Sequence, residues 1–462
     1  MKRFFLASFA LITFAACTNN KPQPIEIKGN IQNLETAYAL VMSKGITDTV
    51  KIEADGNFSF NTEISTPQYF TLRAGRIRHT FFMTPGNISI ISLNVGNLEE
   101  VPKFTGDNSE YNVIIRQANQ VFTSLTQNFA ALYNLPKDEF LAKLDSAKSE
   151  VQKLIPIAEK KDKQFAKMEM ARADYKVKEL LYNYPKYNAL INKVEYVSNP
   201  SDHSFMAEVD FNNIDHISIN EYTSLVFSHL QNEYWTIISN DSNKGISEFE
   251  QNLIFFDLVD SLVSDPTLRD LYKYNQTKET IVWSSIEVAE NIGNHFLGIA
   301  TFSPYKESIE YTLAKRMLLA PGKIAPDFTL ECIDGETYSL NDFKGKLVYI
   351  DFWATWCSPC RKEIPYLAKL KEAYKNKPIV FVAISLDDNK EAWVKMVTED
   401  KLGGYQLYAQ KAWQSDAAQQ YQISGVPTFV LIDAEGKIIQ YPASRPSEEE
   451  TPLLFDKHLK LM

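Results

Sequence analysis

Cysteine and histidine are both scarce in this sequence of 462 residues, which contains four cysteines and six histidines. So few cysteines exclude a fold that depends on a framework of disulfides. Stability must come instead from buried apolar side chains, and hydrophobic residues make up 45% of the sequence. That is ample material for large apolar cores, and the length indicates about three domains.

Two further features are missing, a long apolar run after the first 16 residues and an excess of positive charge. No later segment reaches the roughly 20 apolar residues that a membrane-spanning helix needs. The formal net charge is -10, which argues against binding to nucleic acid or to anionic lipid surfaces. We therefore expect no nucleic-acid partner.

The N-terminus has the pattern of a bacterial export signal. A lysine and an arginine precede an apolar run that is too short for an ordinary membrane span. Cys17 follows small residues and begins a polar stretch, as at a lipoprotein cleavage site, although Phe14 replaces the usual leucine. The pattern predicts a signal peptide over 1–16, a lipid on Cys17 and a tether over 17–24. Cleavage into a soluble periplasmic protein is the alternative, and either outcome exports the protein.

Two regions of different character follow the N-terminus. Residues 25–106 contain alternating apolar and polar side chains between turn dipeptides, which is typical of antiparallel strands. Over 107–319 the spacing becomes helical, and Phe140, Leu144 and Val151 fall on one apolar stripe. The sequence therefore predicts an N-terminal antiparallel β domain and a central α-helical region. Neither region contains a recognisable group of catalytic residues.

The clearest chemical signal is the motif Cys357-Ser358-Pro359-Cys360, which follows the apolar run 347–353 and precedes a helix-compatible stretch. A cysteine at a helix start faces unpaired backbone N–H groups and the positive end of the helix dipole, which stabilise a thiolate. Cys357 is therefore the predicted nucleophile. Cys360 lies one turn deeper on the same face and is the predicted resolving thiol. The spacing also allows a redox-active disulfide within one helical turn.

Other interpretations of this motif fit less well. Half of a structural zinc site has the same spacing, but the remaining cysteines are Cys17 and Cys332, and His458 is the one histidine in the last third of the chain. Trp356 and Pro359 suit an exposed apolar contact surface, which argues against a buried structural pair. Cys332 alternates with apolar neighbours and is predicted to be buried, without the sequence context of a peroxidatic cysteine. We expect redox chemistry with no metal and no other cofactor.

The segment from Gly322 to about Leu461 resembles the thioredoxin-like domain of TlpA/ResA-type thiol-disulfide oxidoreductases. Besides the cysteine motif, the segments that carry the resemblance occur in the expected order: Ala325-Pro326-Asp327-Phe328-Thr329-Leu330, Asp334-Gly335, Phe343-Lys344-Gly345-Lys346 and Gly425-Val426-Pro427-Thr428. The resemblance implies a thioredoxin-like α/β domain over 320–462, with an α/β insertion over 387–413. The β-rich region in turn resembles a domain of unknown role at the N-terminus of many lipoprotein oxidoreductases of this type.

The resemblance also implies a place where the substrate binds. Pro427 corresponds to the cis-proline that faces the active-site cysteines, and its missing N–H leaves the backbone of Val426 free to pair with an extended client segment. Trp356 and Pro359 would add apolar contacts to that client. The alternative for Pro427 is an ordinary proline at the start of a strand.

Two carboxylates are candidates for acid/base catalysis. Asp351 matches the position where thioredoxins carry a buried carboxylate beneath the resolving cysteine, so its pKa should be raised into the range useful for proton transfer with Cys360. A structural Asp is the alternative, and the lysine that accompanies this carboxylate in thioredoxins is Ala383 here. Glu363 matches an acidic position of the family and is either a second acid/base or a surface carboxylate of the helix.

Taken together, these features predict a lipid-anchored, periplasm-facing thiol-disulfide oxidoreductase of the cell envelope. Its partners would be exported client proteins that contain disulfides. The resemblance favours a reductase that is recharged by a membrane electron donor of the DsbD/CcdA kind, and an oxidase or an isomerase is the alternative. A different class of function is also open, a non-enzymatic lipoprotein that binds a ligand or envelope partner and carries a vestigial redox domain.

Overall fold

The computed structural model describes residues 21–34, 36–75, 77–97, 100–160, 162–197, 199–240 and 245–461. The chain forms two compact units. The first comprises the chain up to Ser43 with Asp48–Leu132 and Asp138–Ala173, and the second comprises Lys44–Thr47, Tyr133–Lys137 and the chain from Asp174 onward. The cysteine motif therefore belongs to the second unit.

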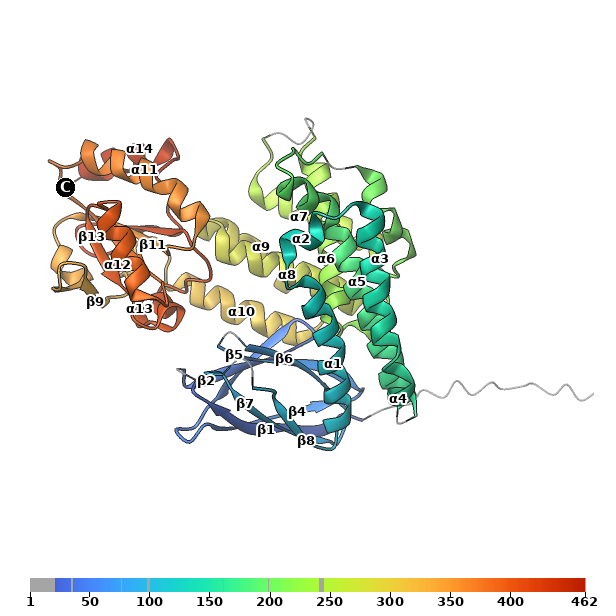
Figure 1. The fold of residues 1–462 in the computed structure, drawn as a ribbon. Coiled ribbons are helices and arrows are strands. Elements are labelled where there is room, and N and C mark those ends of the chain that lie inside the picture. Colours follow the sequence, from blue (N-terminus) through green and yellow to red (C-terminus); the bar gives the residue numbers. More distant parts are fainter. Residues whose placement is uncertain are drawn as a thin grey trace, which may run out of the picture. The chain divides into compact units, whose positions relative to one another are not determined.

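Most of the first unit is a β-sandwich of two four-stranded sheets (Figure 1). One sheet has the order β4 (Asn57–Ile64), β1 (Gln23–Gln32), β7 (Ile88–Asn94) and β8 (Lys103–Gly106), and the other has the order β3 (Ile46–Lys51), β2 (Tyr38–Ser43), β5 (Gln68–Ala74) and β6 (Ile77–Met83). Buried residues from both sheets form one apolar core, with Ile27 and Leu72 fully buried in it.

One strand pair of the sandwich departs from the expected antiparallel arrangement. β1 pairs with β4 antiparallel but with β7 parallel. The physical reason is that alternation of apolar and polar residues specifies which face of a strand is buried. It does not specify the direction in which two strands that are distant in sequence will pair. The prediction of a purely antiparallel domain was wrong at this pair.

Helices follow the sandwich, as the change in spacing predicted. They are α1 (Ser109–Thr126), α2 (Phe129–Tyr133), α3 (Lys137–Gln152), α4 (Ile155–Glu159) and α5 (Lys163–Ile191). Phe140, Leu144 and Val151 of α3 are buried, which confirms the predicted stripe. In the first unit the buried Glu169 carboxylate accepts a hydrogen bond from the Tyr69 hydroxyl at 2.8 Å, which joins α5 to β5 of the sandwich.

Several helices of the second unit begin at side-chain caps. After the 3-10 segments η1 (Pro200–Glu208) and η2 (Ile214–His216) come α6 (Asn220–Ile238), α7 (Glu248–Leu262), α8 (Pro266–Trp283), α9 (Ile286–Ile299) and α10 (Ser303–Met317). The Asp265 carboxylate accepts hydrogen bonds from the backbone N–H groups of Thr267 and Leu268, both at 2.9 Å. Such side chains satisfy N–H groups that a helix start otherwise leaves unpaired.

A seven-stranded sheet of order β10-β9-β13-β12-β11-β14-β15 forms the C-terminal part of the second unit. Its strands are β9 (Thr329–Cys332), β10 (Thr337–Ser339), β11 (Leu347–Trp353), β12 (Ile379–Ser385), β13 (Tyr405–Tyr408), β14 (Thr428–Ile432) and β15 (Ile438–Gln440). The helices are α11 (Ser358–Ala373), α12 (Lys390–Glu399), α13 (Asp416–Gln420) and α14 (Glu450–Leu459), with 3-10 turns η4 (Leu340–Phe343) and η5 (Ala412–Gln414). This is the predicted thioredoxin-like α/β architecture.

Helices cover both faces of this sheet, and β11 lies inside it between β12 and β14. All seven residues of β11 are buried, because successive side chains enter two different cores. Tyr349 packs with Leu367 of α11 and Phe455 of α14, whereas Ile350 packs on the opposite face with Tyr421. The insertion expected after β12 is α12 with β13, and β13 lies in the sheet between β12 and β9.

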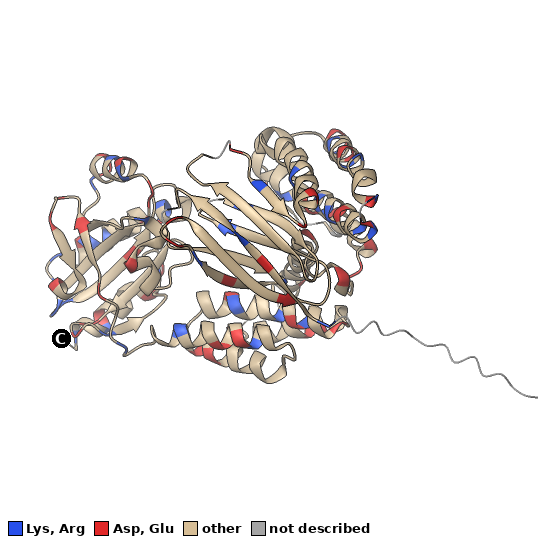
Figure 2. Ribbon diagram, turned by 90° about the horizontal axis from the view of Figure 1, so that it is seen from below, with Lys and Arg blue, Asp and Glu red and all other residues tan. Residues whose placement is uncertain are grey.

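Charges of both signs are interspersed along the helices and strands rather than gathered by sign (Figure 2). Within the ranges that the structure describes, no helix combines the length and the apolar character needed to cross a membrane.

Candidate active site

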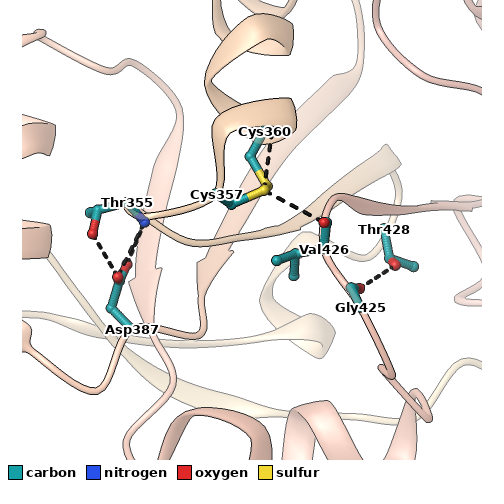
Figure 3. Close-up of a disulfide and its surroundings, with 7 residues drawn as sticks. All are labelled: Thr355, Cys357, Cys360, Asp387, Gly425, Val426 and Thr428. Atoms are coloured by element: carbon teal, nitrogen blue, oxygen red, sulfur yellow. Dashed lines mark hydrogen bonds between the residues drawn. A yellow bond between two sulfur atoms is a disulfide. The ribbon is translucent and has the colours of Figure 1, made fainter. Parts of the chain in front are cut away.

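Cys357 occupies the N-cap of α11, directly after the loop that leaves β11 (Figure 3). Its Sγ accepts a hydrogen bond from the backbone N–H of Cys360 at 3.1 Å, so the sulfur takes the place that a serine or aspartate oxygen takes at an ordinary cap. The two cysteines form a disulfide, with their Cα atoms 5.3 Å apart. The sequence places the sulfur where the positive end of the helix stabilises negative charge.

Both cysteines are buried in this disulfide form, with 3% of Cys357 and 4% of Cys360 exposed. The exposed contact surface predicted around the motif does not include Cys357 itself. It is covered because Trp353, Tyr408 and the other members of one apolar cluster pack around the two sulfurs. The exposed surface at the motif belongs to the neighbours instead, since Trp356 is 60% exposed.

The segment before β14 faces the disulfide. The Val426–Pro427 peptide bond is cis, as the resemblance implied, and the Val426 carbonyl oxygen lies 3.5 Å from Cys357 Sγ. The Thr428 hydroxyl donates to the Gly425 carbonyl at 2.8 Å, which holds the turn (Figure 3). Val426 and Pro427 are both partly exposed.

A residue from the helical part of the second unit also reaches this turn. A Cβ atom at Gly425 would lie 2.5 Å from Trp283 Cη2, so a larger residue there would have to displace the indole. Trp283 ends α8 and is half exposed. Arg316 fixes this end of α8, because its Nη2 donates to the carbonyls of Ser284 at 2.9 Å and Tyr441 at 2.7 Å. Sequence reasoning missed Trp283, since nothing local links it to a turn that is far away in the chain.

Asp387 is a second residue that sequence reasoning missed, and it holds the loop before Cys357. Its carboxylate accepts from the Thr355 backbone N–H at 2.9 Å and from the Thr355 hydroxyl at 2.7 Å. The Ser385 hydroxyl donates to the same carboxylate at 2.7 Å. Asp387 is 2% exposed, so these bonds form away from solvent (Figure 3). A carboxylate at the end of β12 meets the loop after β11 because the two strands are parallel neighbours.

Asp351 lies in β11 and is 8% exposed. Burial raises its pKa to about 7, the charge of Lys371 opposes that rise, and the charge of Glu363 adds to it. The raised pKa agrees with the expectation from the sequence. Ala383 pairs with Asp351 in the register of β11 and β12. A role of Asp351 in proton transfer stays a prediction.

The sequence left two alternatives for Glu363, an acid/base and a surface carboxylate. The second was wrong, because Glu363 is only 8% exposed. Its oxygens accept hydrogen bonds from the backbone N–H of Ser447 at 3.0 Å and from the Ser447 hydroxyl at 2.9 Å. The carboxylate therefore ties α11 to the segment before α14. Its candidate role as an acid/base stays a prediction.

Three other residues were singled out from the sequence: Cys332, Pro359 and Cys17. Cys332 is a buried free thiol, as expected, and burial raises its pKa. Pro359 is exposed beside the disulfide. Cys17 lies outside the described residues. Within the described ranges, no group of three or more His, Cys, Asp or Glu side chains is placed to hold a metal ion.

Comparisons with known proteins agree with this geometry. A family model described as Redoxin matches residues 320–452, and a model described as a domain of unknown function (DUF4369) matches residues 25–113. A thiol-disulfide oxidoreductase ResA from Bacillus thuringiensis is 35% identical over 129 residues, which are 28% of this chain and 73% of that protein. The ResA protein of Bacillus subtilis is 34% identical over 122 residues, 26% of this chain and 66% of that protein.

Among solved structures, the thioredoxin domain of a thiol-disulfide oxidoreductase from Bacteroides vulgatus is 41% identical to this chain. The likeness covers 30% of this chain and 98% of that one, with a TM-score of 0.28.

We predict that Asp387→Ala loosens the loop before Cys357. The Thr355 and Ser385 groups that now bond to the carboxylate would be left without it, at a cost of about 1–3 kcal/mol in the free energy of unfolding. Hydrogen exchange of the Thr355 amide should become faster, and the midpoint of thermal unfolding should fall. Glu391→Ala, which removes a nearby exposed carboxylate, is the matched control. Unchanged exchange at Thr355 in Asp387→Ala would contradict the assignment.

Proposed function

Because this chain belongs to the ResA-like thiol-disulfide oxidoreductases, we propose that it exchanges disulfides with exported client proteins through Cys357 and Cys360, as a reductase. The observation that carries the proposal is the position of the Cys357 sulfur. It caps α11, accepts the Cys360 N–H at 3.1 Å and lies 3.5 Å from the Val426 carbonyl. One sulfur thus combines stabilisation of a thiolate with an adjacent segment, Val426–Pro427, that is partly exposed.

The proposed cycle begins from the reduced dithiol. The Cys357 thiolate attacks one sulfur of a client disulfide, that S–S bond breaks, and the other client sulfur leaves as a thiolate that takes up a proton. Cys360 then loses its proton and attacks Cys357 Sγ. The mixed disulfide breaks, the client leaves with both sulfurs reduced, and the protein holds the Cys357–Cys360 disulfide. Two electrons have passed from the protein to the client.

The client is proposed to bind as an extended segment along Val426 and Pro427. The cis bond at Pro427 and the exposed Trp356, which precedes Cys357, support this mode of binding. An extended client segment needs both backbone partners and apolar contacts. Trp283 extends the apolar surface at Gly425. Asp351 is proposed to take the proton of Cys360, and Glu363 is the second candidate for that step.

The cysteine pair gives a direct test of this cycle in the full chain. Cys357→Ser removes the attacking sulfur and should abolish reduction of a model disulfide such as insulin. Cys360→Ser retains the attacking sulfur but cannot release the client, so a mixed disulfide through Cys357 should accumulate and be detected by mass spectrometry. Cys332→Ser is the control and should leave turnover unchanged. Full activity of Cys357→Ser, or no turnover by the wild type with any electron donor, would defeat the proposal.

We further propose that the protein is anchored in the envelope by a lipid on Cys17, faces the periplasm and is recharged by a membrane electron donor of the DsbD/CcdA kind. The export pattern over 1–16 supports the anchor, and a reductase in an oxidising compartment needs such a donor.

The anchor predicts a specific change when Cys17 is replaced. In cells labelled with a fatty acid, the wild-type protein should carry the label and sediment with membranes. Cys17→Ala should lose the label and leave the membrane fraction. Cys332→Ala is the control for loss of a cysteine as such. Labelling that persists in Cys17→Ala would contradict the proposed anchor.

A further inference from the structure

A residue of the helical region borders the proposed client site. Trp283 is the last residue of α8, and its indole Cη2 and Cζ2 would lie 2.5 and 3.0 Å from a Cβ atom placed at Gly425. Gly425 directly precedes Val426, whose carbonyl oxygen lies 3.5 Å from Cys357 Sγ (Figure 3). The indole therefore packs on the residue next to the one that faces the reactive sulfur.

A buried arginine fixes the end of α8 beside this turn. The carbonyl of Ser284, the residue after Trp283, accepts a hydrogen bond from Arg316 Nη2 at 2.9 Å. The same nitrogen donates to the Tyr441 carbonyl at 2.7 Å, and Arg316 Cζ lies 4.4 Å from the centre of the Tyr441 ring. Arg316 is 2% exposed. One side chain thus joins the end of α8 to the segment that follows β15.

The turn itself is also tied to the helical region. Gln422 Nε2 donates a hydrogen bond at 2.7 Å to the carbonyl of Lys315, which lies in the last turn of α10. Gln422 and Gly425 belong to the same short segment between α13 and β14. That segment therefore meets the helical region at two points, which holds the Trp283 indole beside Val426.

Two tryptophans expose large apolar surfaces beside the disulfide. Trp283 is 51% exposed, and Trp356 is 60% exposed. The ring of Trp356 lies 6.3 Å, centroid to centroid, from that of Trp413, and both Trp413 and Val426 pack against the core of the seven-stranded sheet. Tryptophan is enriched at surfaces where proteins bind one another, and an exposed apolar surface next to a reactive group is typical of a binding site.

We propose that Trp283 is a specificity-determining residue for disulfide exchange, and that it selects client segments with a large apolar side chain, above all an aromatic one, within two residues of the reacting cysteine. The proposal rests on the function proposed above. An extended chain rises about 3.3 Å per residue, so a client bonded to Cys357 Sγ brings its nearest residues to Gly425 and the indole. Aromatic side chains stack favourably on such a ring. The helical region thereby forms part of the client site.

The test uses the full chain with Cys360→Ser, in which a peptide thiol stays bonded to Cys357. Two short peptides compete for Cys357 in a glutathione buffer until the exchange reaches equilibrium, one with phenylalanine and one with alanine on both sides of its single cysteine. Mass spectrometry of a digest gives the ratio of the two mixed disulfides at Cys357. The phenylalanine peptide should be preferred about tenfold. Trp283→Ala should lower that preference about fivefold, and Trp283→Phe, which keeps an aromatic ring, should restore most of it.

The matched control is Trp235→Ala, because Trp235 is likewise an exposed tryptophan near the end of a helix, at 58% exposure in α6. It should leave the preference unchanged. The inference would be overturned if Trp283→Ala kept the full preference, or if the chain with Trp283 intact showed none. The competition measures an equilibrium and needs no turnover, so absence of disulfide reduction by the wild type would defeat the proposed function while leaving this test intact.

Discussion

The hydrogen bond from the Cys360 backbone N–H to Cys357 Sγ is the constraint on which the rest of this site depends. It exists because the chain turns from β11 into α11 at Cys357, so the sulfur meets the free N–H groups of the first helical turn. The sheet supplies the rigid base for that turn, with all of β11 buried between two cores. Displacement of α11 relative to the sheet would move Cys357 Sγ away from the Val426 carbonyl oxygen.

Two buried carboxylates lie near this turn, and their surroundings suit them to different tasks. Asp387 receives hydrogen bonds from Thr355 and Ser385, so its oxygens are occupied and it acts as a fixed clamp. Asp351 has an oxygen without a partner, and burial raises its pKa to about 7. A carboxyl group that changes protonation near neutral pH can exchange protons with a thiol, whereas a fully bonded carboxylate holds a loop in place.

The sequence was most informative where function is encoded by neighbouring residues. The cysteine motif, Pro427 and the position of Asp351 could all be placed because each depends on a short local pattern. Trp283 and Asp387 could not, since each becomes part of the site only when distant strands and helices come together. Glu363 was placed on a helix correctly, yet its burial depends on Ser447, far along the chain.

The reduction potential of the Cys357–Cys360 couple tests the proposed reductase most directly. The full chain would be equilibrated with thiol buffers of known potential, and its free thiols trapped and counted. The account predicts a value of about -270 mV or lower, as for reducing thioredoxins, which a dedicated electron donor must maintain. A value near about -120 mV would make the protein an oxidant and contradict the proposed direction of electron flow.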